Sequence, residues 1–188
     1  MAHCNTIFAQ ILKLVPRHEF ERLAKQHHSG RSFRTASRWS QFVMLTMAQL
    51  SGRLSLRDIV ENTAAQIHRL YHLGSVILSR SNLSRINEGK PYTLYETLFG
   101  KLLKRCQGLA AGHDFRFNNP LYSLDASTID LCLSVFPWAD FRTTKGAIKL
   151  HVGLNHGGYL PEFVTVTDGK TADISVGRTL LFPKGSIV

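Results

Sequence analysis

Apolar residues in the first half of the chain recur three or four positions apart, which is the spacing of one face of an α-helix. The clearest run extends from Trp39 to Leu50 and follows Ser37, so it predicts a capped helix that packs in a core. A second run, from Tyr92 to Ala111, predicts a long amphipathic helix that Gly112 ends. Shorter helices are predicted around 7–15, 16–24 and 56–60.

The hydrophobic period changes after a polar, turn-prone stretch at 113–120. From Ala147 to Leu154, apolar and polar residues alternate, which predicts a β-strand. The pair Gly157-Gly158 predicts a tight turn into a second strand at 163–167, and together these segments predict a β-hairpin. A short helix capped by Asp173 and the start of another buried strand at 186–188 are expected to follow.

These patterns predict an α+β fold with two domains. Residues 1–117 form an all-helical module, and residues 118–188 form a domain of antiparallel hairpin strands plus one helix. We place the boundary in the polar stretch that separates the two hydrophobic periods.

A carboxylate follows a predicted strand in the second domain. Leu121 to Leu124 is predicted as a short buried strand that ends at Asp125, and a further alternating strand is predicted from Asp130 to Phe136. Asp125 and Asp130 are five positions apart, so they would face opposite ways on one straight strand and form a poor pair for one metal. Asp125 either holds a metal for phosphate chemistry, or it caps a turn or pairs with a lysine.

Composition limits the classes of function. Lys and Arg outnumber Asp and Glu by 23 to 13 in 188 residues, and this balance favours a polyanionic partner such as nucleic acid or an anionic membrane surface. A hydrophobic content of 44% excludes wholesale disorder. No apolar run reaches the ~20 residues that cross a bilayer, and the interrupted apolar patch near the N-terminus is not expected to be a secretory signal. Three distant cysteines without CxxC spacing indicate a reducing, cytoplasmic location.

Two segments of the helical module are candidates for DNA binding. The first is the polar loop 27–38, in which Arg31, Arg34 and Arg38 are expected either to lie along phosphates or to be solvated. The second is the stretch 79–88, which resembles a helix-turn-helix recognition helix. With Leu83 and Ile86 toward a core, it would turn outward the residues Ser81, Asn82, Ser84, Arg85 and Asn87. Asn pairs with adenine and Arg with guanine, but an unliganded polar surface helix has the same pattern.

Several motifs carry a resemblance to a known family. The run from Leu124 to Ala139 resembles the start of the catalytic domain of bacterial insertion-sequence transposases of the "insertion sequence four" family. Further motifs match the same family in the same order. They are 144–151 and 167–170 in the second domain, and 8–10, 41–42, 48–50 and 55–58 in the helical module.

The resemblance implies a ribonuclease H-like domain with a catalytic set of two aspartates and one glutamate (DDE). Asp125 matches the first aspartate, as catalytic residue and metal ligand, and the other two carboxylates have no matching position in the 188 residues. Lys145 and Lys149 are candidates for contacting the DNA backbone, although exposed lysines are also common as plain surface charge.

The resemblance further implies Mg²⁺ or Mn²⁺ as cofactor and a homo-oligomer in a full-length relative. Two divalent ions ~4 Å apart would serve strand cleavage there, and a single carboxylate is not expected to hold them.

We therefore expect the N-terminal part of a transposase that binds double-stranded DNA at transposon ends and does not cut it. Two other classes remain open at this point. One is a non-catalytic regulator that occupies the same ends or poisons full-length multimers. The other is a metal-dependent hydrolase unrelated to DNA, which the basic charge disfavours.

Overall fold

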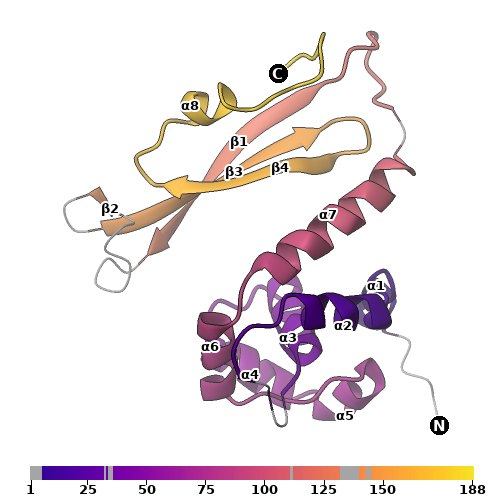
Figure 1. Ribbon diagram of the computed structural model, residues 1–188, viewed down its shortest axis with the longest axis vertical. Helices are drawn as coiled ribbons and strands as arrows, with labels where there is room; N and C mark the ends of the chain where they lie inside the picture. The colour runs from indigo at the N-terminus through magenta and orange to yellow at the C-terminus, as the bar shows by residue number, and fades with distance from the viewer. Residues whose placement is uncertain (1–5, 32, 34–35, 111, 132–139, 143–144) are drawn as a thin grey trace. The chain divides into compact units, whose positions relative to one another are not determined.

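The computed structural model describes residues 6–31, 33, 36–110, 112–131, 140–142 and 145–188 (Figure 1). Contacts divide the chain into two compact units, Met1–Gly100 and Lys101–Val188. The first unit is helical and the second contains the sheet, so the predicted α+β class is confirmed. The division falls inside helix α7 (Thr93–Gln107), whereas the boundary expected from the sequence lies ten residues beyond the end of that helix.

Several helices of the helical unit begin at a capping side chain. Its elements are α1 (Ile7–Lys13), α2 (Arg17–Gln26), α3 (Arg38–Leu50), α4 (Leu56–Ala64), α5 (Ile67–Leu70), the 3₁₀ turn η1 (Tyr71–Leu73), α6 (Arg80–Gly89) and the start of α7. The hydroxyls of Thr6, Ser37, Ser55 and Ser79 each accept a hydrogen bond from the backbone N–H three residues later. These caps explain why the sequence pattern locates the helix starts well.

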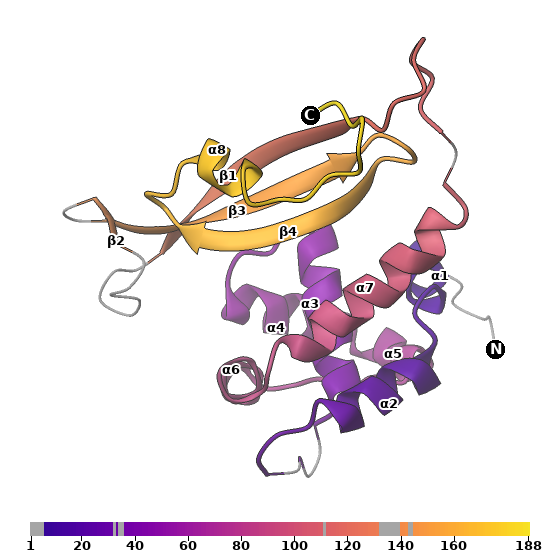
Figure 2. The same ribbon diagram turned by 45° about the horizontal axis from the view of Figure 1, so that its top comes forward.

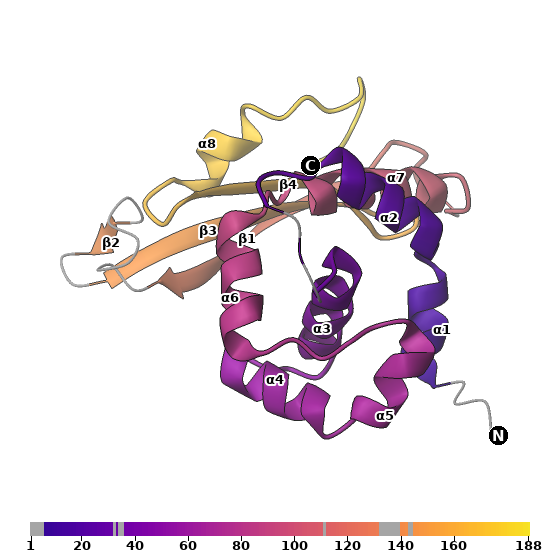
Figure 3. The ribbon, with the colours of Figure 1, turned by 60° about the horizontal axis from the view of Figure 1, so that its bottom comes forward.

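Helix α3 is the centre of this unit, with α1, α2, α4, α5 and α6 around it (Figure 3). At one end, the rings of Phe20, Trp39 and Phe42 pack together, with centroids 5.0 to 5.6 Å apart. At the other, a buried cluster joins α3 to α4, α6 and the segment before α6. Its members are Met44, Ala48, Ile59, Leu78, Leu83 and Ile86. The second cluster fixes α4 and α6 against the same helix.

The sheet unit is an antiparallel meander with β3 (Lys145–Asn155) between β1 (Tyr122–Leu131) and β4 (Leu160–Asp168). The short strand β2 (Asp140–Arg142) pairs with the start of β3. The antiparallel pairing of β3 with β4 confirms the β-hairpin that the alternation of apolar and polar residues predicts. Helix α8 (Asp173–Gly177) follows β4, where the sequence predicts a short helix.

The end of the chain returns to β1. Leu121 and Ile187 form a parallel bridge, in which the Tyr122 N–H donates to the Ile187 carbonyl at 2.8 Å. The Ile187 N–H in turn donates to the Pro120 carbonyl at 2.9 Å. The bridge agrees with the strand start expected at 186–188, but the expectation that this strand is buried is wrong, because Ile187 and Val188 are 44% and 60% exposed.

The prediction of a strand that ends at Asp125 is wrong. β1 runs without interruption through Asp125, and each of its residues pairs with β3 without a register shift. The small residues after Asp125 continue the ladder, because they fit a pleated surface as well as a turn. The remainder of the second predicted strand, 132–136, lies outside the described residues. Helix α7 ends at Gln107 and not at Ala111.

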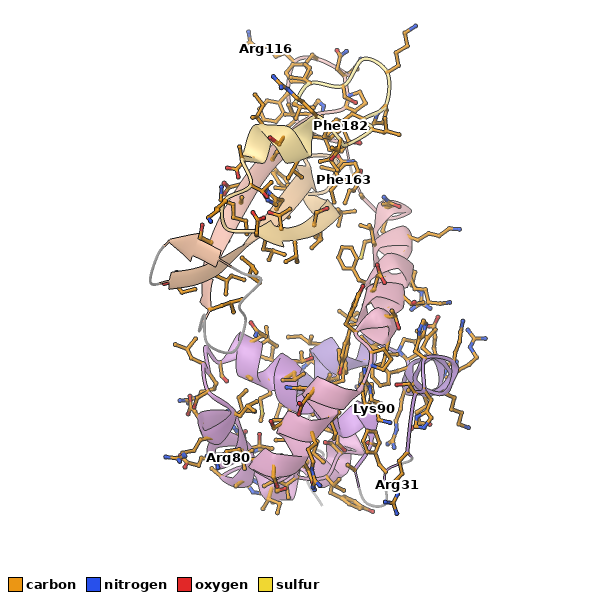
Figure 4. The ribbon with its side chains drawn as sticks, turned by 60° about the vertical axis from the view of Figure 1, so that its left-hand side comes forward. Arg31, Arg80, Lys90, Arg116, Phe163 and Phe182 are labelled. Atoms are coloured by element: carbon orange, nitrogen blue, oxygen red, sulfur yellow. The ribbon has the colours of Figure 1, made fainter. Side chains whose placement is uncertain are left out.

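The two faces of the sheet differ. Tyr122 and Leu124 lie on the face that α8 and the segment after it cover (Figure 2). There the rings of Tyr122, Phe163 and Phe182 form a triangle with centroids 5.0 to 6.0 Å apart, and Figure 4 shows Phe163 and Phe182 beside each other. Asp125 lies on the opposite face. Among the described residues, no helix is long and apolar enough to cross a membrane.

Candidate nucleic-acid interface

Helix α6 has one buried side and one polar side. Leu83 and Ile86 point into the core and are 0% and 2% exposed, respectively. Ser81, Ser84 and Arg85 are exposed and recur three and four positions apart, which places them on one outer face. This orientation agrees with the one expected for the stretch 79–88, and it offers hydroxyl and guanidinium donors to a ligand outside the unit.

The two asparagines of α6 are bonded within the unit. The Arg85 guanidinium donates to Asn82 Oδ1 at 2.5 Å, so Asn82 orients the arginine. The buried amide of Gln41 in α3 donates to Asn87 Oδ1, so Asn87 holds α6 against α3. Of the candidates predicted on this helix, Ser84 and Arg85 therefore keep side chains directed outward, and the asparagines support their position.

A groove of about 660 Å³ lies between the first turns of α4 and α6. Two arginines line it, Arg57 from α4 and Arg80 from α6, together with Leu56 and the hydroxyls of Ser55, Ser81 and Ser84. Both arginines are exposed, and no ion pair is found for either among the described residues. Two guanidinium groups that share one groove repel each other, and an anion between them would relieve that repulsion.

Sequence reasoning missed both groove arginines. Each stands in the first turn of a helix, within two residues of a capping serine, but nothing in the sequence shows that α4 packs beside α6. The contact between these helices depends on the buried cluster of Ile59, Leu83 and Ile86, whose partners are far apart in the chain.

The loop 27–38 contributes one exposed cation that the structure describes. The Arg31 side chain is exposed and points outward (Figure 4). Lys90, at the end of α6, donates hydrogen bonds to the carbonyls of Ser29 and Arg31 and lies 4.8 Å from the centroid of the Phe33 ring. Arg34 lies outside the described residues.

Arg38 takes part in helix packing. It is the first residue of α3 and is 8% exposed, and its Nη2 donates to the Pro91 carbonyl at 3.0 Å. Burial lowers the pKa of the Arg38 guanidinium, and the neighbouring Tyr95 opposes this shift in part. Because a phosphate would have to displace these contacts, we leave Arg38 out of the interface.

Asp125 is exposed, and its carboxylate neither caps a turn nor pairs with a lysine among the described contacts. Ser123 and Ser127 flank it on the same face of β1, and Val152 lies opposite it in β3. Within the described part of the chain, its Oδ1 accepts a hydrogen bond from the N–H of the following residue, Ala126, at 2.8 Å. The carboxylate is therefore accessible to a cation or to a partner.

The residues that the structure describes do not form a two-metal site. No group of three or more His, Cys, Asp or Glu in this part of the chain is arranged to hold a metal ion. Asp130, which pairs with Ala147, is five positions from Asp125 in the same strand. Because five is an odd number, Asp130 faces the other side of the sheet, as the sequence predicts. Asp125 alone cannot hold two divalent cations, and we derive no cleavage step from it.

Lys149 lies on the face that α8 covers. Its Nζ donates to the Thr171 carbonyl at 2.9 Å and forms an ion pair with Asp173 at 3.1 Å. The prediction that Asp173 caps α8 is wrong, because its carboxylate contacts Lys149 and the capping position is Ala172. Of Lys145 the structure describes the backbone only, as the first residue of β3.

Comparison with known proteins adds two relationships. Residues 3–76 match a family described as "Domain of unknown function (DUF4372)", which is less than half of the chain. A "Probable transposase for insertion sequence element IS5377" from Geobacillus stearothermophilus is 28% identical over 100 residues. No solved structure matches the chain.

The alignment with the Geobacillus protein covers 53% of this chain and 26% of that protein. The chain therefore matches about a quarter of the length of its curated relative. It is a distant homologue of a transposase, with a DUF4372 domain at its N-terminal end.

Proposed function

We propose that this chain is a transposase-related protein whose helical unit binds double-stranded DNA at transposon ends. The observation that carries the proposal is the outer face of α6 beside the groove of Arg57 and Arg80. The distribution of charge supports it. Residues 1–100 contain 13 Lys and Arg against 6 Asp and Glu, whereas residues 101–188 contain 10 against 7.

In this proposal α6 enters the major groove, which accommodates an α-helix. Arg85, held by Asn82, reads a base edge, for which a bidentate contact to guanine is the usual partner. Arg57 and Arg80 contact phosphates and set the position of the helix without reading sequence. Ser84 lines the same groove as Arg57 and Arg80 and is the neighbour of Arg85 in the helix, so its hydroxyl would donate to either kind of acceptor.

We assign the sheet unit to the ribonuclease H-like folds of the "insertion sequence four" transposases. The antiparallel meander followed by a helix and a parallel bridge beside β1 supports this assignment. Asp125 would be the first carboxylate of the catalytic set, and Lys145 a contact to the DNA backbone. Mg²⁺ or Mn²⁺ would require carboxylates beyond Asp125, so we propose binding without cleavage for the 188 residues.

The test begins with selection of duplexes from a random-sequence pool by the purified chain. Wild type should enrich one sequence, and Arg85→Gln should lose preference at one base pair at a cost of about tenfold in affinity. Arg57→Gln and Arg80→Gln should weaken binding uniformly and reduce the salt dependence. Arg53→Gln is the matched control, because Arg53 is exposed and already pairs with Asp58 at 3.3 Å.

Two outcomes would overturn the proposal. The first is an absence of any salt-sensitive DNA affinity in the wild-type chain. The second is an equal loss of affinity in Arg53→Gln and in the three other variants.

A second candidate function is that of a regulator, which occupies transposon ends and excludes an active enzyme. The exposed hydroxyl and guanidinium donors of α6 and its groove would be sufficient for it, because occupation of an end needs DNA contacts and no metal site. A cleavage assay on the selected duplex with magnesium tests the shared expectation of no cutting. Efficient cutting by the wild-type chain that Asp125→Ala abolishes would contradict both forms of the proposal.

A further inference from the structure

Lys90 joins the loop that carries Arg31 to the C-terminal end of α6. Its ammonium group donates to two carbonyls of the loop, those of Ser29 and Arg31, and lies 4.8 Å from the centroid of the Phe33 ring. Phe33 itself packs against the buried cluster under α4 and α6. The loop is therefore attached to α6 by polar and apolar contacts together, and Arg31 is held near one end of the helix.

The opposite end of α6 has its own cations. Arg80 is the first residue of the helix and lines the groove with Arg57. Arg80 and Lys90 lie toward opposite ends of the helix, with Arg31 on the side of Lys90 (Figure 4). Cationic groups therefore flank α6 at both of its ends, and its outer face between them carries Ser81, Ser84 and Arg85.

We propose that Lys90 is a positioning residue that holds Arg31 for contact with the DNA backbone, so that α6 is flanked by phosphate contacts at both ends. This inference rests on the proposed DNA-binding function. It adds that Arg31 contacts phosphates on the rim of the major groove opposite to the rim reached by Arg57 and Arg80.

The dimensions of the partner fit this arrangement. A helix of ten residues is about 15 Å long. The major groove of B-DNA is about 12 Å wide and has a row of phosphates along each rim. A helix that crosses the groove therefore places its two ends near phosphates of the two strands, where cations stabilise the complex most.

Lys90 supports Arg31 and does not replace it as a DNA contact. An ammonium group has three N–H donors, and two of them are used by the carbonyls while the cation faces a ring. Removal of the ammonium would leave the Arg31 carbonyl free and would release the arginine from a fixed direction. Removal of the Lys90 ammonium should therefore lower DNA affinity only as far as Arg31 contributes to it.

A double-mutant cycle in the full chain separates this role from plain charge. Affinity for the duplex selected from the random-sequence pool is measured for Arg31→Gln, Lys90→Met and the double variant. Lys25→Met is the control, because Lys25 is an exposed lysine. Arg31→Gln should lower affinity about fivefold and reduce the salt slope by about one. Lys90→Met should lower it by a similar factor, and the double variant should lose no more than either single variant.

Two further measurements keep the result independent of folding. Lys90→Arg should restore most of the affinity, because a guanidinium can donate to the same two carbonyls. Trypsin should cut after Arg31 faster in Lys90→Met than in wild type, while the thermal transition shows that the unit stays folded.

Additive losses from Arg31→Gln and Lys90→Met, or a Lys90→Met effect no larger than that of Lys25→Met, would overturn the positioning role. If wild type binds DNA and depends on Arg85 while this coupling is absent, only the present inference fails. If wild type does not bind DNA, the proposed function fails first.

Discussion

The guanidinium carbon of Arg38 lies 5.2 Å from the centroid of the Tyr95 ring, inside the helical unit. Each residue has a buried polar atom for which the described part of the chain provides no hydrogen-bond partner, Arg38 Nη1 and the Tyr95 hydroxyl. Burial raises the pKa of Tyr95 to about 12, and the nearby Arg38 opposes this shift only in part. The phenol therefore remains neutral under ordinary conditions.

Tyr95→Phe should change how stability depends on pH. The folded pKa of Tyr95 is raised from 10.0 to about 12, so ionisation disfavours the folded state. The contribution of the protonated Tyr95 phenol to folding stability is complete below the unfolded-state pKa of 10.0. It is lost as the pH rises from 10.0 toward the folded-state pKa of about 12. The phenylalanine variant should lack this loss, and at neutral pH it should be up to about 1 kcal/mol more stable, because no bonded hydroxyl is removed.

Absorbance of the phenolate and denaturant unfolding measure these two effects. The late titration step should disappear in Tyr95→Phe. Tyr122→Phe is the control, since burial and Glu162 also raise the pKa of Tyr122. A late step that persists unchanged in Tyr95→Phe and vanishes in Tyr122→Phe would contradict the assignment.

Gly153→Ala should destabilise the sheet unit. A Cβ at Gly153 would lie 2.7 Å from Cδ2 of Phe163 and 3.2 Å from Leu124, so the aromatic triangle under α8 would have to shift. Overpacking of this kind costs about 1–3 kcal/mol. Denaturant unfolding followed by tryptophan and far-UV signals measures the loss.

Gly100→Ala is the matched control for that variant. Gly100 lies in α7, and a Cβ there meets nothing within 4 Å. Alanine should therefore stabilise the helix by up to about 1 kcal/mol. Equal destabilisation by both substitutions would show that the packing of Phe163 on Gly153 is not the cause.

Lys149→Gln should leave DNA affinity unchanged, because the ammonium group is already bonded to Thr171 and Asp173. The cost in stability should be at most about 1 kcal/mol, since the Asp173 side chain is 59% exposed and water screens the pair. Anisotropy with a labelled duplex and thermal unfolding provide the two measurements. A tenfold loss of DNA affinity would instead make Lys149 a contact.

Asp125→Asn should unfold at the same temperature as wild type, with or without magnesium chloride. The carboxylate is exposed and has no cationic partner among the described contacts, so its charge contributes little to folding. Millimolar magnesium should not raise the unfolding temperature of either form, because a ligand stabilises only a state that binds it. A rise in wild type that the variant lacks would reveal a metal site that includes Asp125.

Much of the fold could be predicted from local patterns. Ser37 and Ser55 cap the helices that follow them, and the alternation from Ala147 to Leu154 becomes β3 as expected. These features depend on residues close in sequence, and their physical cause acts over the same short range. The confirmed α+β class follows from them.

The rest depends on contacts between distant residues. β1 continues past Asp125 because β3, more than fifteen residues later, provides a partner for every position. The groove of Arg57 and Arg80 exists because α4 and α6 share a buried cluster. Arg38 is buried because Pro91 and Tyr95 cover it. A single sequence contains no direct signal of such pairs.

Because β1 pairs with β3 without interruption, the face of the sheet to which the Asp125 carboxylate points depends on whether the number of residues before it in the strand is odd or even. Deletion of one residue between Tyr122 and Asp125 would turn that side chain to the opposite face of the pleat, among Phe163 and Phe182. A charged carboxylate enclosed by aromatic rings is strongly disfavoured, so the strand would have to slip or unfold. The number of residues in β1 upstream of Asp125 is therefore fixed by the aromatic packing on the other face of the sheet.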